Sequence, residues 1–182
     1  MSPIIGITAS SISRSYASAF DSIATASGTG SSGTITFSNI PSNYKHLQIR
    51  FICQRATSTA GLTIQFNSDT GSNYASHSLS INNTTTAIVN NNASAATSMA
   101  NLAYGTSTTS STAVGVIDIE DYSSTTKAKT VRSLNGWNLN GTGQLFLASG
   151  LWTTTDAVST ITITSSTNFN TATEFALYGI RG

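Results

Sequence analysis

Apolar residues alternate with polar ones in short runs along most of the chain, and this period of two constrains the fold more than any other feature. Successive side chains of a β-strand point to opposite faces, so the alternation is typical of strands that bury one face. We expect the apolar positions of the clearest runs to lie inside the protein. They are Ile35, Phe37, Leu47, Ile49, Phe51, Leu62, Ile64 and Phe66.

About ten such runs, each bounded by Gly, Asn, Ser or Pro, predict strands. They cover residues 35–37, 47–53, 62–66, 74–81, 84–89, 113–119, 130–137, 144–152, 159–164 and 175–180. The chain of 182 residues holds 30 Thr, which suit an exposed strand face, and 30 Ser and 15 Asn, which suit turns. The expected fold class is all-β, an antiparallel β-sandwich formed by residues 34–182 as one domain.

The segment 1–33 has weak periodicity and is expected to be an N-terminal arm with a flexible Gly/Ser linker. Tyr16, Phe20 and Ile23 are spaced as on one face of a short helix that could dock on another surface, and the alternative is a loose tail. The run from Gly28 to Gly33 matches the dinucleotide-binding pattern G-x-G-x-x-G. That motif works only between a strand and a helix, and a strand is expected to follow here, so we interpret the run as a linker.

Charge is scarce. Lys and Arg number 8 and Asp and Glu 7, so 8% of residues are charged, while 38% are hydrophobic. This balance excludes a disordered acidic or basic tail. A net charge of +1 gives no field to attract phosphates or anionic lipid, so we expect no nucleic-acid or membrane partner. We find no signal peptide or long apolar run, and expect a soluble, unprocessed chain.

Few side chains could perform catalysis, and we expect no enzyme, no catalytic residue and no cofactor. His46 and His77 are the only histidines, and no G-x-S-x-G motif presents a serine to either of them. Both read as polar positions on strand faces. Cys53, the only cysteine, continues an inward apolar row and is expected to be a small buried residue without a disulfide.

The only acidic cluster is a candidate for weak calcium binding. Asp118, Glu120 and Asp121 could supply part of an oxygen shell, although their spacing does not match an EF-hand loop. The alternative is ion pairing with the basic residues that follow closely, Lys127, Lys129 and Arg132. We favour ion pairing and predict no metal.

Three strands, at 114–119, 145–148 and 175–180, carry apolar residues on both faces. A sandwich strand needs only one apolar face, so the second must be covered, and the scarcity of charge favours a second subunit. We therefore expect a homo-oligomer, with Trp152, Tyr178 and Ile180 as interface candidates. Exposed aromatic rings could also stack on glycans. The candidates are Tyr74, Tyr104, Tyr122, Trp137 and Trp152.

Six stretches, taken together, resemble a family of small virion structural proteins of tailed bacteriophages that are common among aquatic phages. They are residues 35–50, 66–74, 117–122, 129–134, 149–152 and 175–182, within a resemblance that runs from about Phe20 to Gly182. The resemblance implies a jelly-roll-like sandwich on a virion, made in the host cytoplasm, without enzymatic activity. It brings no catalytic or ligand residues.

Two function classes follow from this resemblance. The first is a capsid decoration or cement protein, a homotrimer at local three-fold positions that contacts the major capsid protein, with the arm reaching a neighbouring virion subunit. The second is a tail-fibre or receptor-binding component that contacts host glycans. The compact sequence lacks a repetitive shaft, and this favours decoration.

Overall fold

The structure is a computed structural model, and it describes residues 19–82, 87–107 and 110–182. All regular structure in these residues is β-strand, so the all-β expectation is confirmed. The strands are β1 (Phe20–Ser27), β2 (Thr34–Phe37), β3 (His46–Cys53), β4 (Ala60–Phe66), β5 (Tyr74–Asn82), β6 (Ala87–Ala96), β7 (Met99–Gly105), β8 (Ala113–Ile119), β9 (Lys129–Asn138), β10 (Gly143–Trp152), β11 (Ile161–Thr164) and β12 (Glu174–Ile180).

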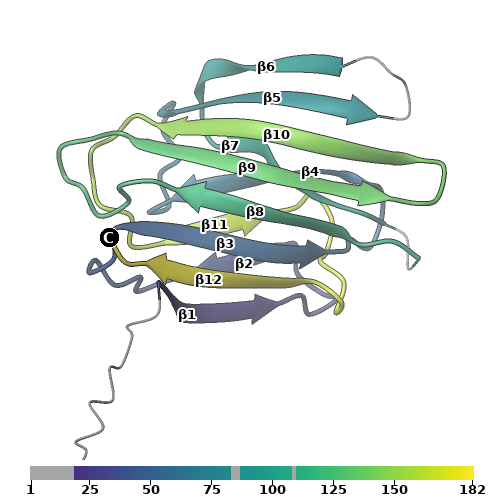
Figure 1. Ribbon diagram of the computed structural model, residues 1–182, viewed down its shortest axis with the longest axis horizontal. Helices are drawn as coiled ribbons and strands as arrows, with labels where there is room; N and C mark the ends of the chain where they lie inside the picture. The colour runs from purple at the N-terminus through teal and green to yellow at the C-terminus, as the bar shows by residue number, and fades with distance from the viewer. Residues whose placement is uncertain (1–18, 83–86, 108–109) are drawn as a thin grey trace, which may run out of the picture.

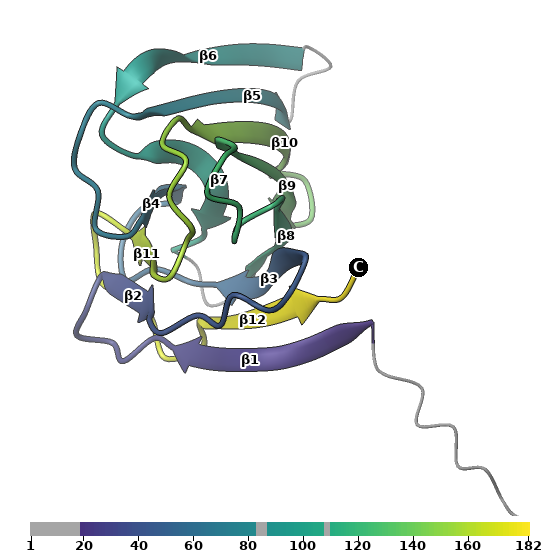
Figure 2. The same cartoon turned by 90° about the vertical axis from the view of Figure 1, so that its left-hand side faces the viewer.

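Two antiparallel sheets pack face to face as a β-sandwich. The larger has eight strands in the order β1-β12-β3-β8-β9-β10-β5-β6, and the smaller has four in the order β2-β11-β4-β7. Figure 1 looks onto the outer face of the larger sheet, with the smaller sheet behind it. In Figure 2 the larger sheet curves around the smaller one, from β1 at one end to β6 at the other.

The strand pairs show how the chain is wound. β1 pairs with β12, β2 with β11, β3 with β8 and β4 with β7, all antiparallel, so these eight strands form one long ribbon folded over both sheets. The other four strands are two inserted pairs: β5 with β6 between β4 and β7, and β9 with β10 between β8 and β11. Both pairs extend the larger sheet beyond β8. We call these four strands the extension.

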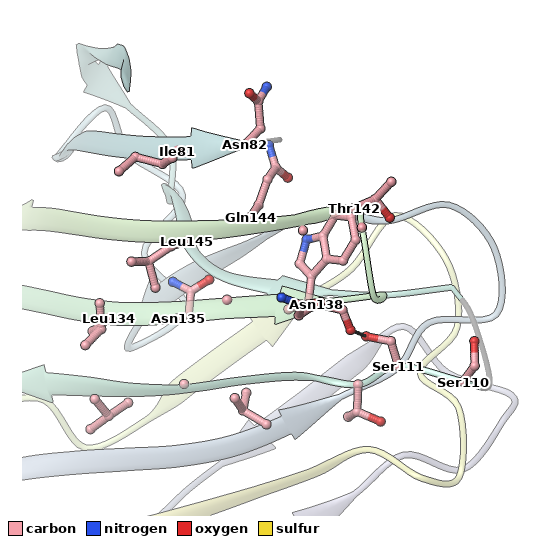
Figure 3. Close-up of a pocket in the computed structure, with 18 residues that line it drawn as sticks. Ile81, Asn82, Ser110, Ser111, Leu134, Asn135, Asn138, Thr142, Gln144 and Leu145 are labelled. Atoms are coloured by element: carbon pink, nitrogen blue, oxygen red, sulfur yellow. Dashed lines mark hydrogen bonds between the residues drawn. The ribbon is translucent and has the colours of Figure 1, made fainter. Parts of the chain in front are cut away.

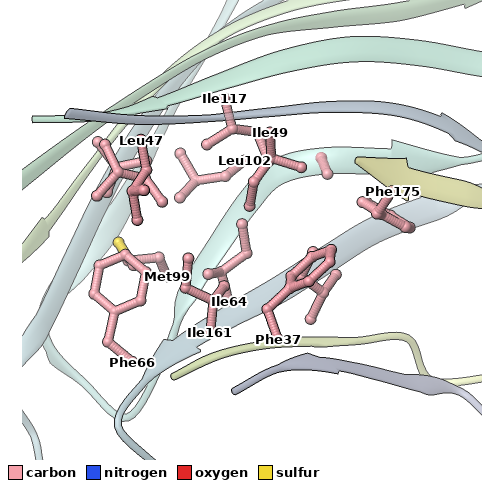
Figure 4. Close-up of a cluster of buried hydrophobic side chains, with 14 of the residues drawn as sticks. Phe37, Leu47, Ile49, Ile64, Phe66, Met99, Leu102, Ile117, Ile161 and Phe175 are labelled. Atoms are coloured by element: carbon pink, nitrogen blue, oxygen red, sulfur yellow. The ribbon is translucent and has the colours of Figure 1, made fainter. Parts of the chain in front are cut away.

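The core lies between the sheets and contains every residue that alternation placed inside (Figure 4). Ile49 in β3 is fully buried and lies in register between Ile117 of β8 and Leu177 of β12. Phe51 stacks on Phe175 with ring centroids 5.2 Å apart. The predicted inward rows are therefore correct, because burial of one face decides the register of a strand.

Alternation missed part of the strand set. β1 and β7 were not predicted, and β6 runs to Ala96, well beyond the expected end at Val89. The expected start of that strand, at residues 84–86, lies outside the described residues. β7 has the sequence Met-Ala-Asn-Leu-Ala-Tyr-Gly, whose buried positions do not alternate. The pairing of β7 with β4 shifts in register between Gly61 and Thr63, and Asn101 has a φ of 62°, so an irregularity in the strand interrupts the period of two.

The boundary of the N-terminal arm at residue 33 is wrong. Residues 20–27 form β1, which pairs along its length with β12, so Phe20 and Ile23 belong to a strand and not to a helix. Tyr16 lies outside the described residues. The Gly28–Gly33 run is a packed connection between β1 and β2, because a Cβ at Gly28 would lie 2.2 Å from the carbonyl oxygen of Asn170. A strand follows this run, as expected.

Candidate functional site

The outer face of the larger sheet carries seven large apolar side chains that the described residues leave exposed. Ile81, Leu145, Val114 and Ile52 lie along one cross-strand row, with Gly136 between Leu145 and Val114. Leu79, Leu147 and Leu134 lie along the next row. Their exposed fractions run from 41% to 55%. We call these seven residues the outer patch.

Parts of two strands of the extension, β5 and β9, have the reverse of the usual polarity, with polar side chains inside and apolar side chains outside. In β5, Ser78 and Ser80 are buried while Leu79 and Ile81 are exposed. In β9, Ser133 and Asn135 are buried on either side of the exposed Leu134. A strand exposed to water on one face normally turns its apolar residues inward. The reversal therefore marks the outer face as a surface that is suited to contact.

β7 packs closely against the inner side of the extension at three positions. The Ala100 amide donates to the Ser76 hydroxyl at 3.3 Å, and the Asn135 amide donates to the Leu102 carbonyl oxygen at 3.3 Å. A Cβ at Gly150 would lie 2.6 Å from the Met99 sulfur, so a larger residue does not fit at that position without a shift of Met99.

A hollow of about 1100 Å³ opens beside the outer patch at the end of β5, β8, β9 and β10 (Figure 3). Leu134, Leu145 and Ile81 line it together with neutral polar residues such as Asn138 and Thr142. No charged side chain lines it among the described residues. Any residue with a side chain at position 136 would be destabilising, because its Cβ would lie 2.6 Å from the Gln144 carbonyl oxygen. The hollow suits an apolar or neutral occupant.

A second, smaller hollow of about 350 Å³ continues this face towards β12. Arg50 lies at its edge, with its guanidinium carbon 5.2 Å from the Phe20 ring centroid and 5.3 Å from that of Tyr178. Tyr178 and Ile180, two of the interface candidates, are half-buried on this side. The structure thus places them at the margin of the exposed apolar surface.

The prediction that Trp152 is an exposed interface residue is wrong. Its side chain is 1% exposed and packs in the core against Phe66 and Tyr74. Its indole nitrogen donates to Asp69 Oδ2 at 2.7 Å. Hydrogen bonds to this carboxylate, first from Trp152 and then from Asn73 and the Gly71 amide, lower the pKa of Asp69. Trp152 fastens the 67–73 loop to the sandwich.

Most of the aromatic candidates for glycan contact are also structural. Tyr74 and Tyr122 are buried, and the Tyr122 hydroxyl donates to the Pro41 carbonyl oxygen. Tyr104 stacks on Phe146 with ring centroids 3.8 Å apart. Trp137 lines the large hollow, and its ring nitrogen has no partner among the described residues. Trp137 is the aromatic candidate that reaches the hollow.

Two residues of the acidic cluster, Glu120 and Asp121, form ion pairs, which is the alternative that the sequence favoured over calcium binding. Asp121 binds Lys127 at 2.8 Å and Lys45 at 3.3 Å, and these two contacts lower the pKa of its carboxyl. Glu120 lies 3.5 Å from Arg132 and 2.9 Å from His46 Nδ1. Asp118 accepts a hydrogen bond from the Gln48 amide at 2.8 Å. In the described residues, no three acidic, histidine or cysteine side chains are grouped as a metal site.

Lys129, in contrast, pairs with no acidic side chain through a described hydrogen bond. It is fully buried, and its ammonium donates to the carbonyl oxygens of Lys127 at 2.6 Å and Thr155 at 3.1 Å. Burial lowers the pKa of this ammonium. Lys129 therefore forms no direct ion pair with the acidic cluster in the described residues, although the negative charges of Asp156 and Asp121 favour its charged form.

Neither histidine lies beside Cys53, so these three residues do not form a nucleophile with an adjacent base. His77 is exposed on β5, and His46 lies beside Glu120 at the start of β3. Cys53 is fully buried and free, as predicted, and burial raises the pKa of its thiol to about 12. A thiol with so high a pKa is protonated at neutral pH and is a poor nucleophile.

Comparisons of the sequence with protein-family models and with curated proteins gave no match. None of the described segments is a helix that could cross a membrane.

Proposed function

We propose that the protein is a non-enzymatic structural subunit of a tailed-bacteriophage virion, and that it acts as a capsid decoration protein. The observation that carries this proposal is the outer patch on a nearly uncharged sandwich. Monomeric proteins rarely expose a continuous apolar surface of this size, and such surfaces usually serve contact with another protein. A surface of this kind suits a protein that works by assembling.

The winding of the chain supports a virion role. We propose that the sandwich is a jelly roll. The supporting observation is a ribbon of eight strands, folded so that β1, β12, β3 and β8 lie in one sheet and β2, β11, β4 and β7 in the other. Jelly rolls are frequent in viral capsid proteins, although they also occur in lectins and enzymes. The fold alone therefore favours the proposal without deciding it.

The segments that carry the family resemblance meet at one end of the sandwich. Lys45 and Asp121 form an ion pair there, and the nearby Trp152 binds Asp69. The C-terminal strand ends at the same place, where a Cβ at Gly179 would lie 2.4 Å from the Tyr44 ring. Residues from several of these segments thus build one structural corner of the sandwich.

The enzymatic alternative has no support in the candidate nucleophile or bases. Cys53 is buried and protonated at neutral pH, and His46 Nδ1 accepts a hydrogen bond from the Asp121 amide at 3.0 Å. A role in assembly needs neither group.

Mass spectrometry and cryo-electron microscopy of purified particles test the proposal. We expect the chain in mature virions, at a copy number set by the capsid lattice, with density on the outer capsid surface. Absence of the chain from particles would overturn the virion role. Density on the tail alone would replace decoration with the second candidate.

That second candidate is a tail component that binds host glycans, and the large hollow favours it. Trp137 and the side-chain amides of Asn138 and Gln144 line the hollow, and an aromatic ring with neutral amides suits a neutral sugar. Glycan-array binding by the wild-type chain, lost in Trp137→Ala and kept in Tyr104→Ala, would favour this function. Tyr104→Ala is the matched control because Tyr104 lies outside the hollow.

A further inference from the structure

We infer that the outer patch is buried against the outer patch of a second copy of this chain, so that two larger sheets pack face to face about a two-fold axis. The inference deepens the proposed function by naming the partner of the apolar face. It rests on the geometry of that face, and it would hold for a subunit of any assembly.

The distribution of exposed apolar residues points to a self-complementary contact. Eight large apolar side chains are exposed among the described residues, and seven of them form the outer patch. The eighth, Phe20, lies on β1 beside Arg50, away from the patch. A head-to-tail contact needs two different surfaces, whereas a two-fold contact uses one surface twice. The described chain offers one such surface.

The charges around the patch fit a second copy better than a charged partner. The patch itself contains no charged residue. The next cross-strand row carries both signs, with Arg132 in register with Asp118, and Arg50 and Glu174 lie at the β3–β12 side. A surface with a neutral apolar centre and a rim of both signs does not repel its own copy.

The patch forms the apolar centre of the proposed contact face. It occupies two cross-strand rows on five neighbouring strands, β5, β10, β9, β8 and β3. At about 4.8 Å between strands and about 3.4 Å per residue, two rows present a projected area of about 330 Å². Specific interfaces bury about 800 Å² of accessible surface per partner and surround an apolar core with a polar rim. A two-fold contact therefore includes the polar residues that flank the patch on the same strands.

Light scattering after size-exclusion chromatography of the full chain tests the inference over a range of concentrations. We expect wild-type protein to have twice the 18.9 kDa mass of one chain. Leu134→Glu, at the centre of the patch, is expected to reduce the mass to that of one chain, because a carboxylate would be buried without a partner. Thr36→Glu is the matched control, since Thr36 is exposed on β2 in the other sheet.

Leu147→Glu is a second variant at the patch, and far-ultraviolet circular dichroism checks that each variant folds. The inference is overturned by a wild-type monomer at every concentration, by a dimer that persists in both folded patch variants, or by a trimer. A trimer would instead support the three-fold closure that the resemblance implies. Particle attachment is measured separately, so a dimer that never reaches virions would refute the proposed function and leave this inference standing.

Discussion

Deletion of the same side-chain atoms from the two faces of β3 should have very different effects on stability. Ile49 is 0% exposed and Ile52 is 44% exposed, although both lie in the same strand of the larger sheet. In Ile49→Ala the neighbours Ile117 and Leu177 cannot collapse into the space, since both belong to paired central strands. We expect a loss of about 2–5 kcal/mol in the free energy of unfolding, from lost transfer energy and the remaining cavity.

Ile52→Ala removes the same three carbon atoms from a side chain that is already nearly half in water. Full burial of such a side chain contributes about 1.5–3 kcal/mol, so we expect a loss of about 1 kcal/mol. Urea denaturation followed by tryptophan fluorescence measures both variants, because the buried Trp152 reports on the core. Dilute protein keeps self-association out of the comparison.

Equal losses in the two variants, or a larger loss for Ile52→Ala, would refute the reasoning. A shift of one residue in the pairing of a strand exchanges its two faces, so this comparison tests the register on which the outer patch depends.

Three further predictions concern other parts of the chain. Because hydrogen bonds from Trp152, Asn73 and Gly71 lower the pKa of Asp69, the stability that its carboxylate contributes is complete above the ordinary aspartate pKa and is lost as the pH falls through the lower folded value. Asp69→Asn should therefore flatten the acid limb of a stability–pH curve, and an unchanged acid limb would contradict the role of these hydrogen bonds. Cys53 should not react with a thiol reagent in the native protein and should react fully in denaturant; native labelling would contradict its burial. Deletion of residues 1–18 should leave the melting temperature within a few degrees of wild type, whereas deletion of residues 1–27 removes β1 and should lower it clearly; equal melting temperatures would contradict the pairing with β12.

The strands that sequence analysis located correctly are those with one buried face. In β3 and β4, burial is decided by the opposing sheet, so hydrophobic periodicity predicted both the strand and its inward residues. β1 was missed because its residues are small and only half-buried at the edge of the sheet. Its pairing with β12 is a contact between opposite ends of the chain, which a local pattern cannot reveal.

The candidate site was predictable in part. Apolar residues on both faces of β8 and β10 indicated a surface that needs a cover, and the structure leaves Val114, Leu145 and Leu147 exposed. Leu79 and Ile81 were missed because alternation with serine reads as an ordinary half-buried strand. The inner face of β5 packs against β7, a tertiary contact that the β5 sequence does not encode. Trp152 failed as an anchor because a large aromatic residue serves a core as well as an interface.

The extension is what connects this fold to assembly. The eight-stranded ribbon already closes a sandwich core, and β5, β6, β9 and β10 lengthen only one of its sheets. Their described inner face holds serine and asparagine against β7, beside the buried apolar side chains of Phe146, Ala148 and Trp152 in β10. The outer patch residues of β5, β9 and β10 lie on the other face, where the described residues of the single chain leave them exposed. Such exposed apolar side chains add little to the stability of one chain, so the arrangement makes sense if a partner that covers this face is part of the working structure.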